Sequence, residues 1–349
     1  MEEQTKISAF LEHILQPGFL VDSGRIIYTN QAAQAMLIQP GIVLEDLLQT
    51  GIEEYASFQE GQLWLTLQIS GRCHNASVER TDAGDLVLLE DQEDMDQFRS
   101  MALAAATMRM PLMQAITSAS QLFTEQPQTE PAAAKMNRNL MQMLRTVCNM
   151  ADISRYAAST RMETRDVDSF LLELFQKAQA LTEDSIQISF NGLQHPVFSR
   201  MDPEQLERAV WNILSNSIKF MPQGGSICAT LTRSGNTLRL TVEDNGSGIP
   251  ESVRPSLFRR YLRQPGIEDH RYGIGLGLAM IRTVAANHGG TLLISSAPAG
   301  GTRIAMTMAI RQEDGNSLHS PIFRPDYTGG FDHALVELSD CLNPSCYKD

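Results

Sequence analysis

The sequence predicts a multidomain protein of the α+β class, with an N-terminal α/β unit, a helical hairpin and a C-terminal α/β unit. Apolar and polar residues alternate as in strands within the segment 64–90. Apolar residues recur every three or four positions through 98–122 and 136–153, as on helices. Four short motifs rich in glycine and asparagine follow one another between residues 206 and 302. A chain of 349 residues has room for these units as two or three domains.

The first predicted domain covers residues 5–92. Its expected elements are a helix at Ile7–Leu15, a hairpin at Gly18–Asn30, a short helix at Gln31–Leu37, and strands at Trp64–Ile69, His74–Arg80 and Leu86–Glu90. Two strands, helices and three antiparallel strands in this order resemble a small PAS sensor domain, and the stretch from Phe19 to Ala33 carries the resemblance. Such domains bind a small ligand or dimerise, and no group of His, Cys or Arg side chains identifies a ligand.

Residues 93–158 are predicted to form an antiparallel helical hairpin. The apolar positions are Phe98, Met101, Ala105, Met108, Leu112, Ala115, Ala119 and Leu122 on the first helix, and Met136, Leu140, Met143, Val147, Met150 and Ile153 on the second. The turn between them, Thr124–Pro131, contains two prolines. An apolar seam this regular usually packs against a second copy, which predicts a dimeric four-helix bundle.

The first of the four motifs lies on a predicted helix from Asp202 to Phe220. Asp202 is the expected N-cap and Pro203 the first helical residue. Asn212 and Asn216 are four residues apart and therefore share one face. Neutral amide oxygens suit Mg²⁺, a hard cation that keeps most of its waters and is shared with substrate phosphates. A polar stripe on an amphipathic surface helix is the alternative for this motif alone.

The next two motifs combine a carboxylate with glycines. A predicted strand at Leu238–Glu243 ends in Asp-Asn-Gly-Ser-Gly-Ile, residues 244–249, where the carboxylate could accept a hydrogen bond from an amino group. The glycines would let the backbone approach a flat ring, although a plain turn also uses these residues. Residues 273–278, Gly-Ile-Gly-Leu-Gly-Leu, open a predicted helix whose free N–H groups would face phosphate.

Together with Gly300-Gly301-Thr302, these motifs resemble the ATP-binding domain of sensor histidine kinases, in the wider family of gyrase, Hsp90 and MutL. The resemblance implies an α/β sandwich over residues 165–311 that binds ATP and Mg²⁺. It makes Asn216 the Mg²⁺ ligand, Lys219 a phosphate contact and Asp244 the adenine reader. The ATP-binding residues that it implies are Asn212, Asn216, Lys219, Asp244, Gly246, Gly248, Ile249, Phe258, Arg263, Gly273, Gly275, Leu276, Gly277, Leu278 and Thr302.

The hairpin departs from the histidine kinase pattern at the phosphoacceptor. The family carries His-Glu-x-Arg-x-Pro-Leu on its first helix, and this chain has Ala-Thr-Met-Arg-Met-Pro-Leu at 106–112. Ala106 replaces the phosphoacceptor histidine, Thr107 replaces the adjacent acid, and no histidine occurs between His74 and His195. Since alanine and threonine cannot form phosphohistidine, autophosphorylation at the usual site is excluded.

The resemblance therefore predicts a sensor histidine kinase-like two-component protein that passes phosphate, if at all, to a partner or an atypical site. Its partners would be a second copy or another histidine kinase, and a response regulator. Thr107 is a weak candidate acceptor, because a hydroxyl without an adjacent base is a poor nucleophile. The alternative is a catalytically inactive regulator that senses ATP. An ATPase like Hsp90 is a third hypothesis, but Asn212 stands where those relatives have a general-base Glu.

Composition limits the remaining classes. A formal net charge of −13 argues against a nucleic-acid partner. Five cysteines without a CxxC pair are typical of reduced thiols. No apolar run approaches the roughly 20 residues that span a bilayer, which predicts a cytoplasmic protein without membrane insertion. Residues 312–349 are expected to be a polar, loosely attached tail, with a short amphipathic helix within 330–340.

Overall fold

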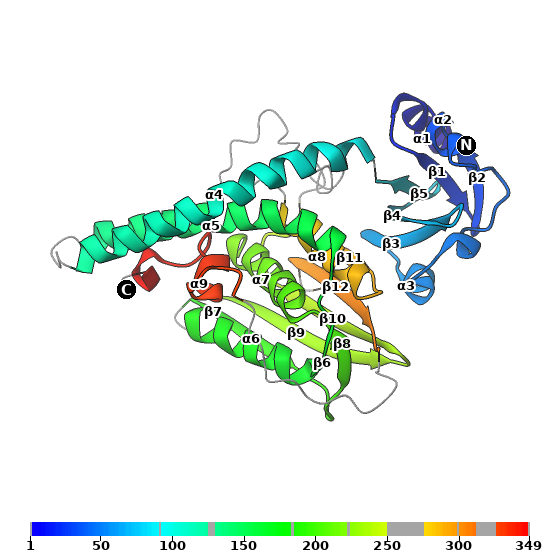
Figure 1. Ribbon diagram of the computed structural model, residues 1–349. Helices are drawn as coiled ribbons and strands as arrows, with labels where there is room; N and C mark the ends of the chain where they lie inside the picture. Colours follow the sequence, from blue (N-terminus) through cyan, green and yellow to red (C-terminus); the bar gives the residue numbers. More distant parts are fainter. Residues whose placement is uncertain are drawn as a thin grey trace.

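The computed structural model of the protein describes residues 2–90, 92–124, 130–182, 185–221, 224–249, 276–298, 300–311 and 326–347. An N-terminal α/β domain is followed by two long helices that run alongside a second α/β domain (Figure 1). The last described residues, 326–347, lie between the long helices and this second domain. Within the described residues, no helix is both long and apolar enough to cross a membrane.

The N-terminal domain is built on a five-stranded antiparallel segment of sheet in the order β2-β1-β5-β4-β3. Its elements are α1 (Glu2–His13), β1 (Gly18–Asp22), β2 (Arg25–Thr29), α2 (Gln31–Ala35), the 3-10 helix η1 (Leu44–Leu47), α3 (Ile52–Ser57), β3 (Gln62–Ile69), β4 (Arg72–Thr81) and β5 (Gly84–Leu89). Buried Asn30 caps α2 by accepting from the N–H of Ala33, and it also donates to the carbonyl of Leu11. The predicted helices, hairpin and three later strands are confirmed, with ends shifted by a few residues.

The two long helices, α4 (Gln92–Thr124) and α5 (Glu130–Ala158), lie antiparallel, as the apolar spacing predicted (Figure 1). Ile116 and Leu144 lie in their shared seam and are completely buried. Other large apolar residues of the pair are more than two-fifths exposed in this single chain, namely Leu103, Met108, Met110, Met136 and Met143. The dimeric bundle stays a prediction.

The second domain is a sheet covered on one face by three helices. Its elements are β6 (Glu163–Asp166), α6 (Val167–Thr182), β7 (Ile186–Asn191), β8 (Phe198–Met201), α7 (Pro203–Lys219), β9 (Gly225–Ser234), β10 (Thr237–Asp244), α8 (Leu276–Asn287), β11 (Leu292–Ser296) and β12 (Thr302–Ala309). The strand order is β11-β12-β10-β9-β7, with only β7 and β9 parallel, while β6 and β8 pair separately. Asp202 caps α7 as predicted, accepting from the N–H of Gln205 at 3.2 Å.

The two α/β domains share one continuous sheet. The start of β3 pairs with β11, from Gln62 opposite Ile294 to Trp64 opposite Leu292, which joins the strands into a ten-stranded sheet. Two ion pairs flank this junction, between Arg239 and Glu54 at 3.3 Å and between Arg282 and Glu90. Edge strands that pair across two domains leave fewer unpaired backbone groups exposed. The sequence carried no sign of this junction.

A substitution of Gly61 by alanine is expected to open the domain junction. Gly61 has φ +94°, and a methyl group on it would overlap the backbone carbonyl oxygen of Ile294. Gly71 is the matched control, because it also has a positive φ of +77° but has open space around it. Both variants lose about 1 kcal/mol to backbone strain. Only Gly61→Ala is expected to speed amide hydrogen exchange on both β3 and β11, and equal exchange in the two variants would contradict the prediction.

The C-terminal segment corrects one expectation. Residues 326–347 were expected to be loosely attached, but they form α9 (His333–Glu337) and a 3-10 helix η4 (Pro344–Tyr347) that pack against α5 and α7 (Figure 1). Val336 and Leu338 are completely buried, and Tyr347 is 1% exposed. The polar composition was misleading because the acidic side chains of this segment pair with cations on helices far away in the sequence.

Candidate functional site

The polar face of α7 forms the first part of the candidate site. Asn212, Asn216 and Lys219 follow at i, i+4 and i+7 and therefore project from the same side of the helix. The first turn of α8 lies directly against them, because a methyl group on Gly277 would be 3.0 Å from Asn212 Oδ1 and 3.7 Å from Asn216 Nδ2. The N-terminal end of a helix thus lies beside two asparagine amides. This combination favours an anionic ligand, because the start of a helix is the positive end of its dipole.

The second part of the site is the carboxylate of Asp244, at the end of β10. Asp244 is 7% exposed. Its Oδ1 accepts hydrogen bonds from the N–H groups of Gly246 and Thr302, both at 3.0 Å, and its Oδ2 accepts from the hydroxyl of Ser217 at 2.9 Å. A carboxylate offers about four acceptor positions, so these three bonds leave room for one more donor on Oδ2. Asp244 could therefore accept a hydrogen bond from an exocyclic amino group of a ligand.

Glycine is required in the loop that follows Asp244. A methyl group on Gly246 would lie 2.9 Å from the carbonyl oxygen of Phe220, and Gly248 adopts φ +68°. The N–H of Ser247 donates to the same Phe220 carbonyl at 3.2 Å. The loop therefore closes onto the C-terminal end of α7 at a distance that a larger residue would not allow.

Helix α7 brings the two parts together, because Ser217, which binds Asp244, directly follows Asn216. The structure thus unites most of the predicted residues that it describes around one end of this helix. Of the predicted apolar members, Leu276 is buried, while Ile249 and Leu278 pack against the main core. Four predicted residues lie outside the described part of the chain: Phe258, Arg263, Gly273 and Gly275.

Two charged residues that sequence analysis did not single out meet this site. Arg145 of α5 donates to Asn212 Oδ1 at 3.2 Å and to Asp340 Oδ2 at 2.6 Å. The same oxygen of Asp340 accepts from Lys219 Nζ at 2.8 Å. Lys219, the predicted phosphate contact, is therefore paired with a carboxylate of the C-terminal segment. No signal in the sequence distinguished Arg145, which is one of three arginines on the second hairpin helix.

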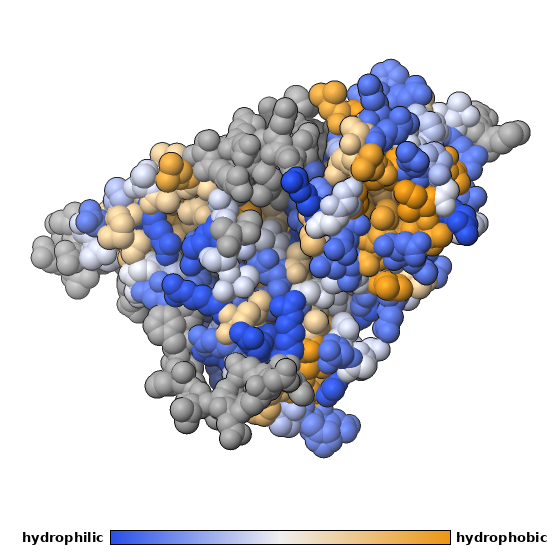
Figure 2. Space-filling model, turned by 45° about the vertical axis from the view of Figure 1, so that its right-hand side comes forward, coloured by the Kyte–Doolittle hydropathy of each residue, from blue (hydrophilic) through white to orange (hydrophobic). Residues whose placement is uncertain are grey.

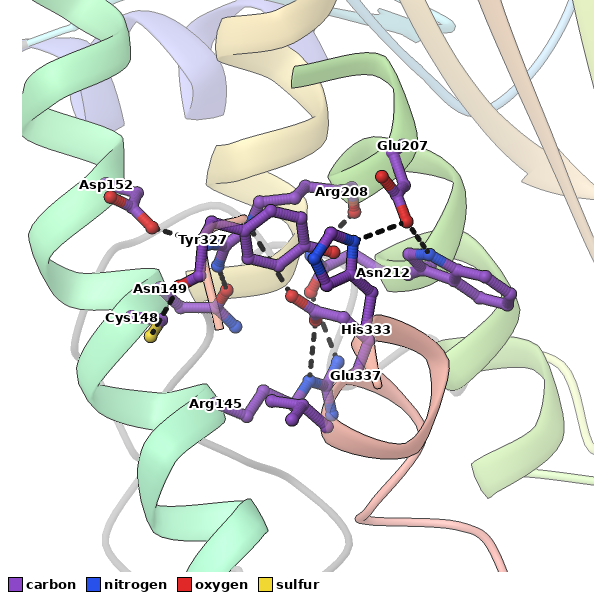
Figure 3. A network of polar contacts seen from close by, with 12 residues as sticks. Arg145, Cys148, Asn149, Asp152, Glu207, Arg208, Asn212, Tyr327, His333 and Glu337 are labelled. Carbon is purple, nitrogen blue, oxygen red and sulfur yellow. Dashed lines mark hydrogen bonds and ion pairs between the residues drawn. The ribbon is translucent and has the colours of Figure 1, made fainter. Parts of the chain in front are cut away.

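A buried charge network continues from Arg145 behind the site (Figure 3). Arg208 of α7 is completely buried and donates to Asp152 at 2.5 Å and to the side-chain oxygen of Asn149, both on α5. Glu337 of α9 is also completely buried; it accepts from Arg145 Nε at 3.2 Å, and its other oxygen lies 3.4 Å from Arg208 Nε. Burial alone would lower the pKa of Arg208, but Glu337 and the other surrounding groups raise it well above its usual value. Helices α5, α7 and α9 are thus joined by the buried charges of Arg145, Arg208, Asp152 and Glu337.

The described residues test a magnesium site only in part. They contain no group of three or more His, Cys, Asp or Glu side chains that could hold a metal ion by protein side chains alone. Asn212 Oδ1 is engaged by Arg145, whereas the half-buried side chain of Asn216 has no hydrogen-bond partner among these residues. Asn216 therefore fits a cation that takes its other ligands from phosphates and water.

The residues that the sequence comparison aligned with the phosphoacceptor histidine and its adjacent acid are exposed on α4. Ala106 and Thr107 both face solvent in the single chain. The Thr107 hydroxyl donates to the carbonyl of Ala104 at 2.7 Å, so its proton is directed to the backbone of its own helix. Arg109, which matches the family motif, lies 4.0 Å from Asp152.

Comparison with known proteins adds the following similarities. Residues 201–312 match the family described as "Histidine kinase-, DNA gyrase B-, and HSP90-like ATPase". The chain is 28% identical over 266 residues to the signal transduction histidine-protein kinase AfsQ2 of Streptomyces coelicolor, covering 69% of this chain and 48% of AfsQ2. It is 28% identical over 233 residues to the histidine-protein kinase/phosphatase MprB of a Mycobacterium species, covering 63% and 44% of the two chains.

Among solved structures, full-length ShkA in complex with AMPPNP aligns with 62% of this chain and 46% of its own, at 19% identity and a TM-score of 0.49. The chain spans about half of the length of AfsQ2, MprB and ShkA.

Proposed function

Because residues 201–312 belong to the histidine kinase-, DNA gyrase B- and HSP90-like ATPase family and the chain is related to sensor histidine kinases, we propose that it is a two-component signalling protein that binds Mg-ATP. The observation that carries this proposal is the meeting of Asp244, Asn216 and Gly277 around the end of α7. Five cysteines without a disulfide support placing the protein in the reducing cytoplasm.

Each residue of the site has a role in this proposal. Asp244 accepts a hydrogen bond from the adenine amino group on its free acceptor position, with Gly246 and Gly248 forming the floor beneath the ring. The first turn of α8 and Lys219 receive the phosphates. Asn216 holds the ion, and the ion supplies charge neutralisation for the phosphates when it is bound.

The rest of the chain supplies input and assembly in this proposal. The N-terminal domain acts as a PAS-like sensor. Figure 2 shows apolar side chains gathered on the side of this domain, whose exposed large apolar residues are Phe10, Leu15, Ile27, Leu37 and Ile52. On the long helices, the exposed methionines and Leu103 support a second copy packed against α4 and α5. The shared sheet at β3 and β11 would carry a change in the sensor directly to the ATP-binding domain.

The destination of the phosphate decides between two forms of the proposal. With Ala106 at the acceptor position, a catalytically active protein phosphorylates the histidine of a partner kinase, which then serves a response regulator. The alternative is a regulator whose ATP occupancy sets a conformation and transfers nothing. Two observations favour this alternative: the bonded hydroxyl of Thr107, and the buried charges that fasten α7 to α5.

Restoring the acceptor motif tests the proposal. The double variant Ala106→His, Thr107→Glu and the wild-type protein are incubated with Mg²⁺ and γ-labelled ATP. If the ATP-binding domain is catalytically active, the double variant acquires an acid-labile label that adding Asp244→Asn abolishes, and the wild type acquires none. If ATP raises the melting temperature of the double variant without labelling it, the regulator form is supported. Absence of any ATP binding would overturn the proposal.

A further inference from the structure

The C-terminal segment 326–347 occupies the groove between α5 and α7, beside the candidate ATP site. It is held there by backbone contacts as well as charges: Gln142 donates to the carbonyl of Ser339 at 2.9 Å, and Asn137 donates to the carbonyl of Tyr347 at 3.3 Å. Both of these contacts come from α5. The segment is therefore packed against α5 by defined contacts, which hold it in one position beside the candidate ATP site.

One carboxylate of this segment reaches into the site. Asp340 Oδ2 lies between two cations from different helices, 2.6 Å from Arg145 Nη1 and 2.8 Å from Lys219 Nζ. Burial alone would raise the pKa of Asp340, but Arg145 and Lys219 lower it below its usual value, so the group is an anion at neutral pH. Its oxygen stands in for an oxygen of a phosphate group, since both are charged acceptors without a proton to donate.

The position of this anion conflicts with a nucleotide. Lys219 projects from the same face of α7 as Asn212 and Asn216, against which the first turn of α8 is packed. Phosphates bound at that turn would need the Lys219 ammonium, which Asp340 now holds. Two anions on one side of a lysine repel each other strongly where water is partly excluded, so one of them must leave.

We propose that segment 326–347 is an internal competitor of the nucleotide, with Asp340 occupying the Arg145–Lys219 cation pair that the terminal phosphates of ATP take when the segment moves away. This inference rests on the proposed ATP-binding function and adds its regulation. ATP binding then weakens the docking of the segment against α5 and α7, and by linkage the docked segment weakens ATP binding by the same factor. Release of the segment is the output of ATP occupancy.

Nucleotide affinity of full-length variants tests the competition. Asp340→Asn removes the competing charge and is expected to bind ATP about tenfold more tightly than the wild type, within the usual range of coupling between sites. Asp332→Asn is the matched control. It removes one negative charge from the same segment and keeps the N-cap of α9, since asparagine caps as well as aspartate; the Lys177 ion pair that it loses is exposed. Its ATP affinity is expected to stay within about twofold of the wild type.

Thiol labelling of the wild-type chain gives a second readout that needs no substitution. Burial raises the pKa of the Cys341 thiol to about 11, which keeps this thiol, one residue after Asp340, slow to react. Under conditions in which labelling is slower than the docking equilibrium, the labelling rate follows the undocked fraction. Saturating ATP is then expected to accelerate labelling by N-ethylmaleimide about tenfold. Mass spectrometry separates Cys341 from Cys73, which is exposed on the N-terminal domain and serves as the internal reference.

The outcomes distinguish the two proposals. Tighter binding by Asp340→Asn, together with faster Cys341 labelling in ATP, supports the competition. Equal affinities of the wild type, Asp340→Asn and Asp332→Asn, with Cys341 labelling unchanged by ATP, overturn the competition and leave ATP binding intact. If Asp340→Asn and the wild type both fail to bind ATP, the proposed function and the competition fall together.

Discussion

Replacing Glu337 with glutamine is expected to lower the free energy of unfolding by about 3 kcal/mol or more, because it removes one partner from a buried ion pair. Arg208 would then keep Asp152 as its buried counter-charge, while Arg145 would keep only Asp340, which is partly exposed. A cation that cannot reach water and has lost its anion carries the full cost of its desolvation. The loss should be seen as a shift in the midpoint of urea unfolding of the full-length protein.

The control for this variant is Glu163→Gln, which removes a carboxylate of the same kind from an ion pair near the surface. Glu163 pairs with Arg165 at 2.9 Å, and its side chain is 40% exposed. Such pairs contribute at most about 1 kcal/mol. If the Glu337 variant unfolded at the same urea concentration as this control and its C-terminal segment resisted protease equally well, the buried network would not be what holds the segment in place. A Glu337 effect confined to the C-terminal segment would appear as increased proteolysis there, with an unchanged main transition.

The second large effect is expected on nucleotide binding. Asp244→Asn should weaken ATP binding about 100-fold, because a hydrogen bond to a charged acceptor is worth about 1.5–3 kcal/mol and each 1.4 kcal/mol is a factor of ten. An asparagine that keeps its oxygen on the N–H groups of Gly246 and Thr302 presents its NH₂ group toward Ser217 and the ligand. Two donors would then face each other where the proposal has a donor and an acceptor.

Asp85→Asn is a matched control for Asp244. Asp85 is buried to a similar extent, 9% exposed against 7%, and is also a hydrogen-bonded carboxylate, accepting from Tyr55 at 2.6 Å. It lies in the N-terminal domain, so its loss should affect stability and leave ATP affinity unchanged. Isothermal titration of both variants with ATP decides the matter. An Asp244 variant that binds as tightly as the Asp85 variant would remove Asp244 from the adenine site.

The elements near the candidate ATP site were predictable because their signals are local. Asp202 and Pro203 predict the start of α7, and the spacing of its apolar residues predicts its buried face. Asp244 follows an alternating strand, and the glycines after it belong to a short motif that is visible in the sequence. The helical hairpin was equally readable, since its apolar spacing extends over many turns.

The C-terminal segment was misjudged because its partners are distant along the chain. In the sequence Glu337 and Asp340 resemble the surface acids of a solvated tail, and Arg145 resembles the other arginines of the second hairpin helix. Their ion pairs join residues more than 190 positions apart. A charged side chain does not reveal from sequence whether it meets water or an opposite charge, and burial in a folded groove decides between these.

The similarity of residues 201–312 to the ATPase family and the two long helices follow from the sequence, as do the residues proposed to bind adenine and magnesium, because each depends on short-range spacing. Tertiary structure decided two further features. One is the shared sheet, because β3 and β11 pair through backbone hydrogen bonds that leave no side-chain pattern. The other is the carboxylate of Asp340 on Lys219, because only folding brings α5, α7 and the C-terminal segment to one place, where opposite charges removed from water must pair.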